Sequence, residues 1–353
     1  MNAAVRAVEI ASHPESQVRN SQPHGIGRVA ALDGLGAWSN LGRNVVFVGP
    51  DLRPRAVFDE SVFTDDEASQ YDLDVHAILD LPGVGLVLTL NHYGMVRAFD
   101  DEEVAALGPT RRVTPIWTQD FAADVERYVI VGGRLVGSRP REHRSAGLLV
   151  SEPLRRDGMA GRLELTTTLE SWGMVSALAS LGAGSVALGG DAHVSIASID
   201  EKGVGIPLWD VAVEFEPAVL VWDGRRVWAA GSEAGAAVDD YDWEALRGGG
   251  FVALDPVDGR IVVRGQLHQD VAWGAGGVAV VIVPELVCAV GRRGEIHLFD
   301  RTDGRWVGTT AVISDTSLGI AHAGLLGDQL VYGFNRGGYR LWTLPVSALR
   351  RTA

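Results

Sequence analysis

The chain has 353 residues, of which 46% are apolar and 44 are glycine; this composition excludes low-complexity disorder and suffices for a large core. The formal net charge is −14, from 31 basic and 45 acidic residues. This balance argues against nucleic acid as a partner, because phosphate binding needs clustered Lys and Arg. The single cysteine, Cys288, excludes an intrachain disulfide and a cysteine-based metal cluster.

Residues 1–23 carry charged side chains throughout and have no apolar stretch long enough for a secretory signal. We expect them to form a flexible N-terminal tail ahead of a folded unit over residues 24–353. The most apolar run, 271–284, is interrupted by three glycines and a proline and is too short to span a bilayer. No membrane partner is expected, and the cytoplasm is the expected location.

Along the chain, apolar residues form short runs rich in β-branched and aromatic side chains, separated by Gly, Asp, Asn and Pro. Almost no segment shows helical spacing. The runs are Asn44–Val48, Gly85–Leu90, Tyr128–Val131, Val219–Trp222, Gly277–Val283 and Gln329–Phe334. Such runs at regular intervals predict an all-β sandwich, barrel or propeller.

Internal similarity decides among these folds. A short pattern returns seven times, with an anchor residue followed by small or apolar residues. The anchors are Asp33, Asp74, Asp120, Ser171, Asp210, Asp270 and Asp315. Their spacings are 41, 46, 51, 39, 60 and 45 residues, about the length of a four-stranded propeller blade. We therefore predict a single seven-bladed β-propeller in which each anchor marks the passage from one blade to the innermost strand of the next.

The third strand of a blade and the turn after it show the repeat well. The pattern stands as Phe251–Gly259 (FVALDPVDG) and again as His297–Gly304 (HLFDRTDG). It resembles the repeats of quinoprotein-like and WD40-like propellers. The resemblance covers nearly the whole chain in architecture and implies no particular activity. Because the Trp docking motifs of pyrroloquinoline quinone (PQQ) enzymes are missing, PQQ is not expected as a cofactor.

Two strand assignments follow from the predicted blades. The inner strand of the sixth blade is expected to begin at Val271. The last blade has three strands before the chain ends, so its fourth strand is expected to be Ile26–Leu32, an N-terminal strand that closes the ring and leaves no open sheet edge. Deleting residues 1–33 should then unfold the protein or make it aggregate, whereas deleting 1–22 should be tolerated.

Six of the seven anchors are aspartates, which would surround one mouth of the central channel. Asp74, Asp210 and Asp270 are the candidates for holding a cation, because clustered carboxylates are costly without a positive charge among them. Alternatively, each Asp bonds the tight turn that enters the inner strand. Repetition at every blade favours this structural role.

Residues that depart from the repeat are more informative. His76 replaces a small or apolar residue two positions after its anchor, which suits proton transfer or metal binding. A core histidine bonded to a neighbouring carbonyl is equally compatible, and His322 on the inner strand of the last blade has the same two interpretations. His268 lies beside the expected carboxylate ring. Trp117 and Trp209 would cage a cationic or planar ligand or, more commonly, pack between blades.

The loops between second and third strands add polar groups on the same face. His92 and His193 are candidates to act with His76 as general acid, general base or metal ligand. Arg292 and Arg336 are candidates to orient an anionic substrate group. A solvated loop is the alternative for all of these positions.

Two function classes remain. Motifs of phosphate loops, serine hydrolases and zinc proteases are missing, so NAD and ATP are not expected. The first class is a small-molecule enzyme of lyase, isomerase or hydrolase type, or a ligand-binding protein, with its site at the channel mouth and a divalent metal as a candidate cofactor. The alternative is a non-catalytic scaffold that presents one face to a protein partner. The departing histidines favour the first class, and the lack of a recognised catalytic signature favours the second.

Overall fold

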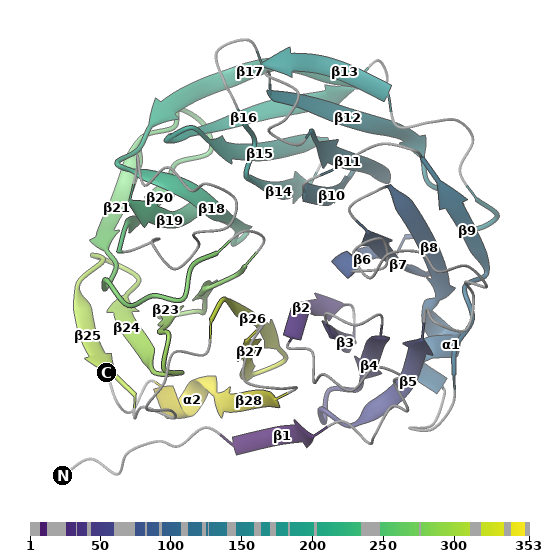
Figure 1. The fold of residues 1–353 in the computed structure, drawn as a ribbon. Coiled ribbons are helices and arrows are strands. Elements are labelled where there is room, and N and C mark those ends of the chain that lie inside the picture. Colours follow the sequence, from purple (N-terminus) through teal and green to yellow (C-terminus); the bar gives the residue numbers. More distant parts are fainter. Residues whose placement is uncertain are drawn as a thin grey trace.

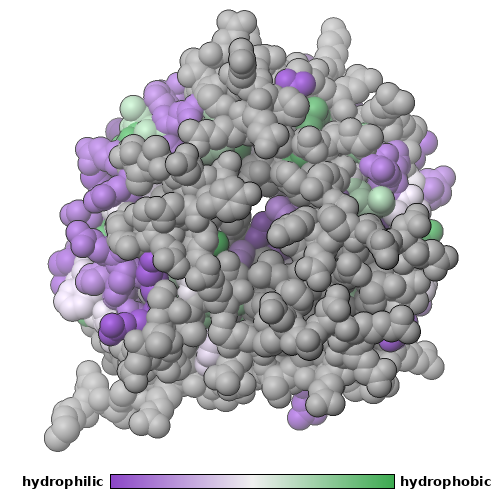
Figure 2. All heavy atoms as spheres, viewed as in Figure 1, coloured by the Kyte–Doolittle hydropathy of each residue, from purple (hydrophilic) through white to green (hydrophobic). Residues whose placement is uncertain are grey.

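The structure, a computed structural model, is almost entirely β-sheet. It describes residues 8–12, 26–32, 34–40, 44–59, 75–81, 83–91, 94–106, 112–121, 125, 127–139, 146–158, 164–169, 174–182, 184–200, 203–233, 248–274, 277–310, 319–334 and 340–349. Within these residues the strands form seven four-stranded sheets. Figure 1 shows the sheets arranged as blades in a ring, and Figure 2 shows the same face hollowed near its centre, with hydrophilic side chains inside. The predicted seven-bladed all-β propeller is confirmed.

Each blade runs from an inner to an outer strand, and neighbouring strands pair antiparallel. Blade one consists of β2 (Ile26–Leu32), β3 (Leu35–Asn40), β4 (Asn44–Val48) and β5 (Pro54–Asp59). Blade two consists of β6 (Val75–Leu81), β7 (Leu86–Asn91), β8 (Met95–Asp100) and β9 (Trp117–Asp120). Blade three consists of β10 (Arg127–Val131), β11 (Arg134–Ser138), β12 (Ala146–Pro153) and β13 (Glu164–Leu169). Blades four and five are β14 (Ala177–Gly182), β15 (Ser185–Gly190), β16 (His193–Asp200) and β17 (Gly203–Ala212); and β18 (Phe215–Trp222), β19 (Val227–Glu233), β20 (Gly250–Leu254) and β21 (Ile261–Gln266).

Blades six and seven complete the ring. They are β22 (Val280–Ile282), β23 (Leu286–Val290), β24 (Ile296–Asp300) and β25 (Trp306–Thr309); and β26 (Ala321–Leu326), β27 (Gln329–Phe334), β28 (Arg340–Pro345) and β1 (Val8–Ser12). Two short helices, α1 (Asp101–Ala106) and α2 (Val346–Leu349), follow β8 and β28. Neither they nor any other helix in the described part of the chain has the length and apolarity to cross a membrane.

The core lies between the blades. Strands β7 and β23 are buried at every residue, which accounts for their continuous apolar sequences. The outer strand β9 instead alternates half-buried and exposed residues. Aromatic rings join adjacent blades: the centroids of Phe47 and Phe99 are 5.7 Å apart, and those of Phe251 and Phe299 are 5.4 Å apart. The packing of neighbouring blades therefore fixes the geometry of the loops at their ends.

Strand β1 closes the ring by pairing antiparallel with β28. An N-terminal strand does close the last blade, but the choice of Ile26–Leu32 is wrong, because that segment is β2, the innermost strand of blade one. β2 and β3 form a hairpin, with Leu32 paired to Leu35, and Gly34 between them has the positive φ of 67° that such tight turns require. The predicted anchor Asp33 lies outside the described residues, but the strands on either side belong to one blade, so no passage between blades occurs there.

This correction changes the deletion experiment. β1 falls within residues 1–23, the segment expected to be a tail, so deleting 1–22 removes a strand rather than an appendage. The deletion would leave β28 as an open sheet edge, which favours aggregation. Tolerance of that deletion is no longer expected.

The sixth blade begins later than predicted. Val271 makes only an isolated bridge to the loop between β23 and β24, and the regular inner strand is β22. The link between β21 and β22 nevertheless packs into the core. Trp273 is 1% exposed, and its Nε1 donates to the carbonyl of Gly248 at 2.9 Å. This anchored link carries His268 and Asp270.

Candidate functional site

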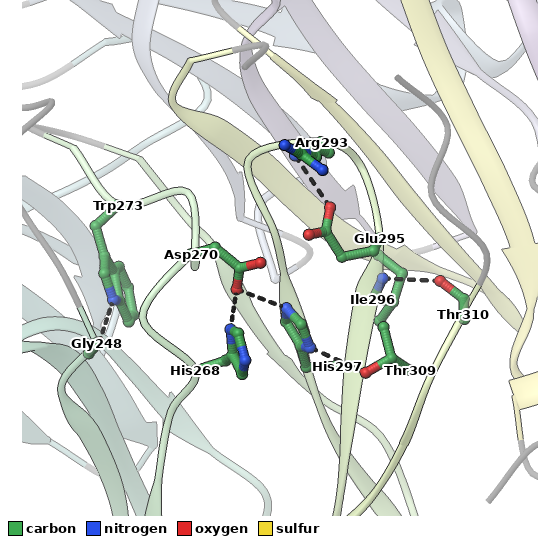
Figure 3. Close-up of polar contacts among 10 residues, drawn as sticks. All are labelled: Gly248, His268, Asp270, Trp273, Arg293, Glu295, Ile296, His297, Thr309 and Thr310. Carbon is green, nitrogen blue, oxygen red and sulfur yellow. Dashed lines mark hydrogen bonds and ion pairs between the residues drawn. The ribbon is translucent and has the colours of Figure 1, made fainter. Parts of the chain in front are cut away.

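Two segments of the sixth blade meet at one end of the propeller (Figure 3). The link from β21 to β22 supplies His268 and Asp270. The loop between β23 and β24 leads into Glu295, directly before β24, and into His297 on that strand. The backbone amide of Arg292 in this loop donates to the carbonyl of Asp270 at 2.8 Å, which ties the two segments together. We call His268, Asp270, Glu295 and His297 the blade-six cluster.

Asp270 is the centre of the blade-six cluster. Its Oδ1 contacts Nδ1 of His268 and lies 2.9 Å from Nε2 of His297. The two imidazole rings stack, with centroids 4.6 Å apart and planes inclined by 16°. Side-chain exposure falls from 58% at His268 to 39% at Asp270 and 5% at His297. The cluster therefore runs from the surface into the protein.

The buried ring of His297 is held by Thr309 on β25, whose Oγ1 lies 3.1 Å from Nδ1. Its other ring nitrogen, Nε2, faces Oδ1 of Asp270. Burial lowers the pKa of His297, and the attraction to Asp270 only partly opposes this effect. In the neutral ring, a proton on Nε2 bonds Asp270, whereas a proton on Nδ1 bonds Thr309 and leaves Nε2 free to bind a metal.

Glu295 adds a second carboxyl group to the blade-six cluster. It is 4% exposed, and its Oε2 accepts a hydrogen bond from the amide of Arg293 at 3.0 Å. Burial and a hydrogen bond to Asp270 raise the pKa of Glu295. Burial alone would raise the pKa of Asp270 too, but bonds from Glu295 and His268 and the nearby His297 lower it. A proton shared by the two carboxyl groups therefore resides on Glu295.

This geometry suits a metal ion. His268, Asp270 and His297 each place a ligand atom within 4.8 Å of the others. Two imidazole nitrogens and a carboxylate oxygen are common ligands of zinc and other divalent transition metals. The hydroxyl of Thr309 orients His297 through the ring nitrogen that would not bind the metal, as a partner of a metal-bound histidine does.

A second His–Asp pair lies in blade four. His193, at the start of β16, places Nδ1 3.0 Å from Oδ1 of Asp210 on β17, and both side chains are about two-fifths exposed. The turn before His193 has positive φ at Asp191 (48°) and Ala192 (58°). Glu216 holds it by accepting both backbone amides, at 2.9 and 3.1 Å. The structure thus joins two predicted residues, although Asp210 lies within β17 rather than in a loop between blades.

The inner-strand histidines lie away from these pairs. His76 is on β6, the innermost strand of blade two, where its carbonyl accepts a bond from Arg28. His322 is on β26, the innermost strand of blade seven, and is 4% exposed. The structure does not bring His76 together with His193 in the contacts that it describes.

Of the remaining predicted residues, some pack against neighbouring blades and others lie outside the residues that the structure describes. Trp209 Nε1 donates to the carbonyl of Pro256 in the next blade at 3.0 Å, so this ring packs between blades. Trp117 is half-buried against the core of blades two and three. Arg292 is half-buried beside Asp270. The residues Asp74, His92 and Arg336 lie outside the described residues.

Sequence reasoning missed Glu295 and His297. His297 could have been found by comparing the third strands of the blades, where it stands out as a buried polar residue. In the strand register, His297 lies opposite Thr309 as Arg97 lies opposite Thr118 in blade two, and both His297 and Arg97 are buried polar residues. Nothing in the local sequence singles out Glu295.

A pocket of about 460 Å³ is lined by blade five and by the link that enters it from blade four. Its wall includes Phe215, Gly249, Phe251 and Arg264. The carbonyl of Gly249 accepts a hydrogen bond from the backbone amide of Leu267, the residue before His268. None of the four cluster residues lines this pocket. We assign the chemistry to the cluster, because the pocket lacks a comparable group of ligand atoms.

Comparison with known proteins adds evidence on the fold. No known protein family matches the chain, and no curated protein is significantly similar in sequence. The crystal structure of the computationally designed protein Ika8 has a TM-score of 0.54 at 13% identity, covering 92% of this chain and 97% of that one. Two structures of Kluyveromyces lactis Hsv2 have TM-scores of 0.54 and 0.55 at 9% and 10% identity, covering 88% of this chain and 90% and 89% of theirs. At these identities the likeness shows the propeller fold alone.

Proposed function

We propose that this protein binds a divalent metal through the blade-six cluster and uses it on a small molecule, in hydrolase, lyase or isomerase chemistry or in ligand binding. One observation carries the proposal: two imidazole nitrogens and a carboxylate oxygen, from His268, His297 and Asp270, lie within 4.8 Å of one another, with Nε2 of His297 2.9 Å from Oδ1 of Asp270. A divalent cation binds such a group of nitrogen and oxygen ligands once the ring nitrogens that face it are unprotonated.

The ligand set supports an open site rather than a closed structural one. His268, Asp270 and His297 are three protein ligands, the number that leaves a coordination position for water or substrate. His268 is the most exposed of them, so the free side of the cluster faces solvent. A divalent metal bound here supplies Lewis acidity to a substrate oxygen.

Glu295 is the candidate general acid or base. It is buried beside Asp270 and has a raised pKa, which suits a carboxyl group that holds a proton and passes it on. The amide of Arg293 fixes its orientation. The guanidinium of Arg292, whose backbone joins the same cluster, is the nearest candidate for an anionic substrate group.

Elemental analysis tests the metal proposal on protein purified without an affinity metal or chelator and then incubated with Zn²⁺ or Mn²⁺. We expect one equivalent of metal per chain in the unaltered protein and its loss in His297→Ala. His193→Ala, in the other His–Asp pair, is the matched control and should retain the metal. Absence of metal from the unaltered protein, or its retention in His297→Ala, would overturn the proposal.

The interaction scaffold is the second candidate function. It is favoured by three exposed apolar side chains on consecutive blades: Leu208 (65% exposed), Val257 (84%) and Trp306 (56%). The narrower quinoprotein-like or WD40-like repeat assignment is compatible with either function. A protein that binds no metal in the experiment above would leave the scaffold as the working function.

A further inference from the structure

Four innermost strands carry nitrogen-bearing side chains around the centre of the ring. They are Arg28 on β2, His76 on β6, Arg127 on β10 and His322 on β26. These strands belong to four consecutive blades, from seven through one and two to three. Arg28, His76 and Arg127 are only half-buried. Their strands are the innermost of their blades and surround the centre of the ring, where Figure 2 shows a hollow. We call the four residues the central cluster.

Arg28 links three blades. Its Nε donates to the carbonyl of His76, and its Nη1 lies 3.3 Å from Nδ1 of His322. A guanidinium group is always protonated and can only donate, so Nδ1 of His322 is the acceptor in this contact. The ring proton of His322 is therefore on Nε2, and the neutral imidazole keeps one N–H donor.

Arg127 makes the same kind of bond between the next two blades. Its Nε donates to the carbonyl of Ser176 at 2.8 Å, just before the innermost strand of blade four. The Ser176 hydroxyl then donates to the carbonyl of Pro217 in blade five. In blade six, the uncharged Val278 bridges to His322. Among the described innermost strands, arginine and histidine side chains occur only in blades seven, one, two and three, where β6 also carries Asp80.

The charges that act on His322 are positive. His322 is fully buried, and burial followed by the charges of Arg28, His76 and Arg127 lowers its pKa well below the ordinary value. The same field that keeps a proton off His322 attracts a negative group. Inter-blade clamping alone would explain the bonds to carbonyls, but it does not require four cationic or imidazole groups to gather on one side.

We propose that the centre of the propeller binds a small carboxylate or phosphate anion against Arg28, His76, Arg127 and His322. Guanidinium groups match the oxygen pairs of such anions, and an imidazole N–H adds a further donor. The chain has a net charge of −14, so a group of cationic side chains at its centre stands out against an acidic background. This site is independent of the blade-six cluster.

Calorimetric titrations with inorganic phosphate and, separately, with succinate test the proposal and distinguish the two ligand chemistries. We expect saturable one-to-one binding of at least one probe. Arg127→Gln, which removes the charge, should weaken it by about tenfold to a hundredfold. Arg127→Lys, which keeps the charge, should retain most of the affinity. Arg264→Gln is the control, since Arg264 is an exposed surface arginine paired with Glu214, and it should bind like the unaltered protein.

A second readout separates binding from clamping. In a proton and nitrogen NMR spectrum of the histidine side chains, a bound anion should raise the pKa of His322, because a negative neighbour favours the imidazolium form. If Arg127 only clamps blades, both variants will melt at lower temperature and neither probe will bind the unaltered protein. Equal affinity of Arg127→Gln and the unaltered protein, or no saturable binding of either probe at millimolar concentration, would overturn the proposal.

Discussion

Asp223 and Asp270 lie at opposite ends of blades five and six and have different kinds of partners. Asp223, in the turn between β18 and β19, accepts hydrogen bonds from Nε1 of Trp228 at 2.7 Å and from two backbone amides at 2.7 and 2.8 Å. It also contacts the guanidinium of Arg301 from blade six, and its side chain is 10% exposed. Asp270 is 39% exposed, and its partners are His268, His297 and Glu295.

The two aspartates differ in whether their partners gain and lose protons near neutral pH. Indole, amide and guanidinium donors keep their protons across the neutral range, so Asp223 has a fixed set of hydrogen bonds that joins two blades. Imidazole and carboxyl partners gain and lose protons, and they are also metal ligands. A half-exposed carboxylate among such partners can take part in chemistry. The two aspartates therefore show how one residue type is structural at one end of a blade and a candidate functional group at the other.

The largest expected effect is on stability, from Asp223→Ala. The substitution leaves Arg301 and the indole of Trp228 without their acceptor, and we expect a loss of about 3 kcal/mol in the free energy of unfolding. Urea denaturation measures it. Asp258→Ala, at an exposed turn aspartate, is the control and should cost less than about 1 kcal/mol. If both variants lose the same free energy of unfolding, Asp223 does not stabilise the contact between blades five and six more than an exposed turn aspartate stabilises its turn.

Asp270→Asn should affect metal binding much more than stability. We expect metal affinity to fall by about a hundredfold or more, because the amide oxygen carries no charge, with little change in the melting temperature. Metal titration followed by calorimetry measures the affinity. Asp210→Asn, in the exposed pair with His193, is the matched control and should leave affinity unchanged. A large fall in melting temperature without loss of affinity would make Asp270 a structural residue like Asp223.

A smaller effect is expected from Thr309→Val, which keeps the shape of the side chain but removes the hydroxyl near Nδ1 of His297. Loss of such a partner typically costs about tenfold in metal affinity. Thr118→Val is the control, since Thr118 occupies the equivalent register position opposite Arg97 in blade two. If both variants bind metal equally well, Thr309 does not orient the histidine for binding.

Most of the fold could be predicted because each blade repeats one pattern of buried strands and polar turns. The errors came where a local signal has two meanings. The Asp33–Gly34 dipeptide fits the pattern of a passage between blades, but Asp-Gly also favours a hairpin turn, and the strands on either side of it pair within one blade. β1 escaped notice because its short sequence, VEIAS, lies in a polar segment and is a strand only through its pairing with β28.

The site was less predictable because its geometry depends on register. His268 and Asp270 stood out through their place in the repeat, and their contact followed from their closeness in sequence. His297 was hidden in a strand pattern that recurs for structural reasons, and its approach to Asp270 depends on how β24 lies beside the β21–β22 link. His193 and Asp210 were singled out for separate reasons, and only the pairing of β16 with β17 brings them together.

The smallest expected effect is a difference in pH dependence between the two aspartates. Burial would raise the pKa of Asp223, but the bonds from Trp228, two backbone amides and Arg301 outweigh it and lower the pKa below its usual 3.8. A carboxyl group whose pKa is lower in the folded protein than in the unfolded chain stabilises the fold. This contribution is complete at pH values above the pKa of the unfolded chain, and it is lost as the pH falls through the pKa of the folded protein. The stability difference between the unaltered protein and Asp223→Asn should thus stay constant from about pH 8 to 5 and shrink below about 3.8.

For Asp270→Asn the difference should instead change at higher pH, through His297. Burial lowers the pKa of His297 from the ordinary value of 6.5 and the Asp270 carboxylate opposes this effect, so removing the carboxylate should lower that pKa further. The unaltered protein should therefore gain stability relative to Asp270→Asn as the pH falls below 6.5. Urea denaturation of metal-free protein at several pH values measures both differences. A flat profile for Asp270→Asn would mean that its histidines do not respond to the carboxylate, and the contrast with Asp223 would then be one of exposure alone.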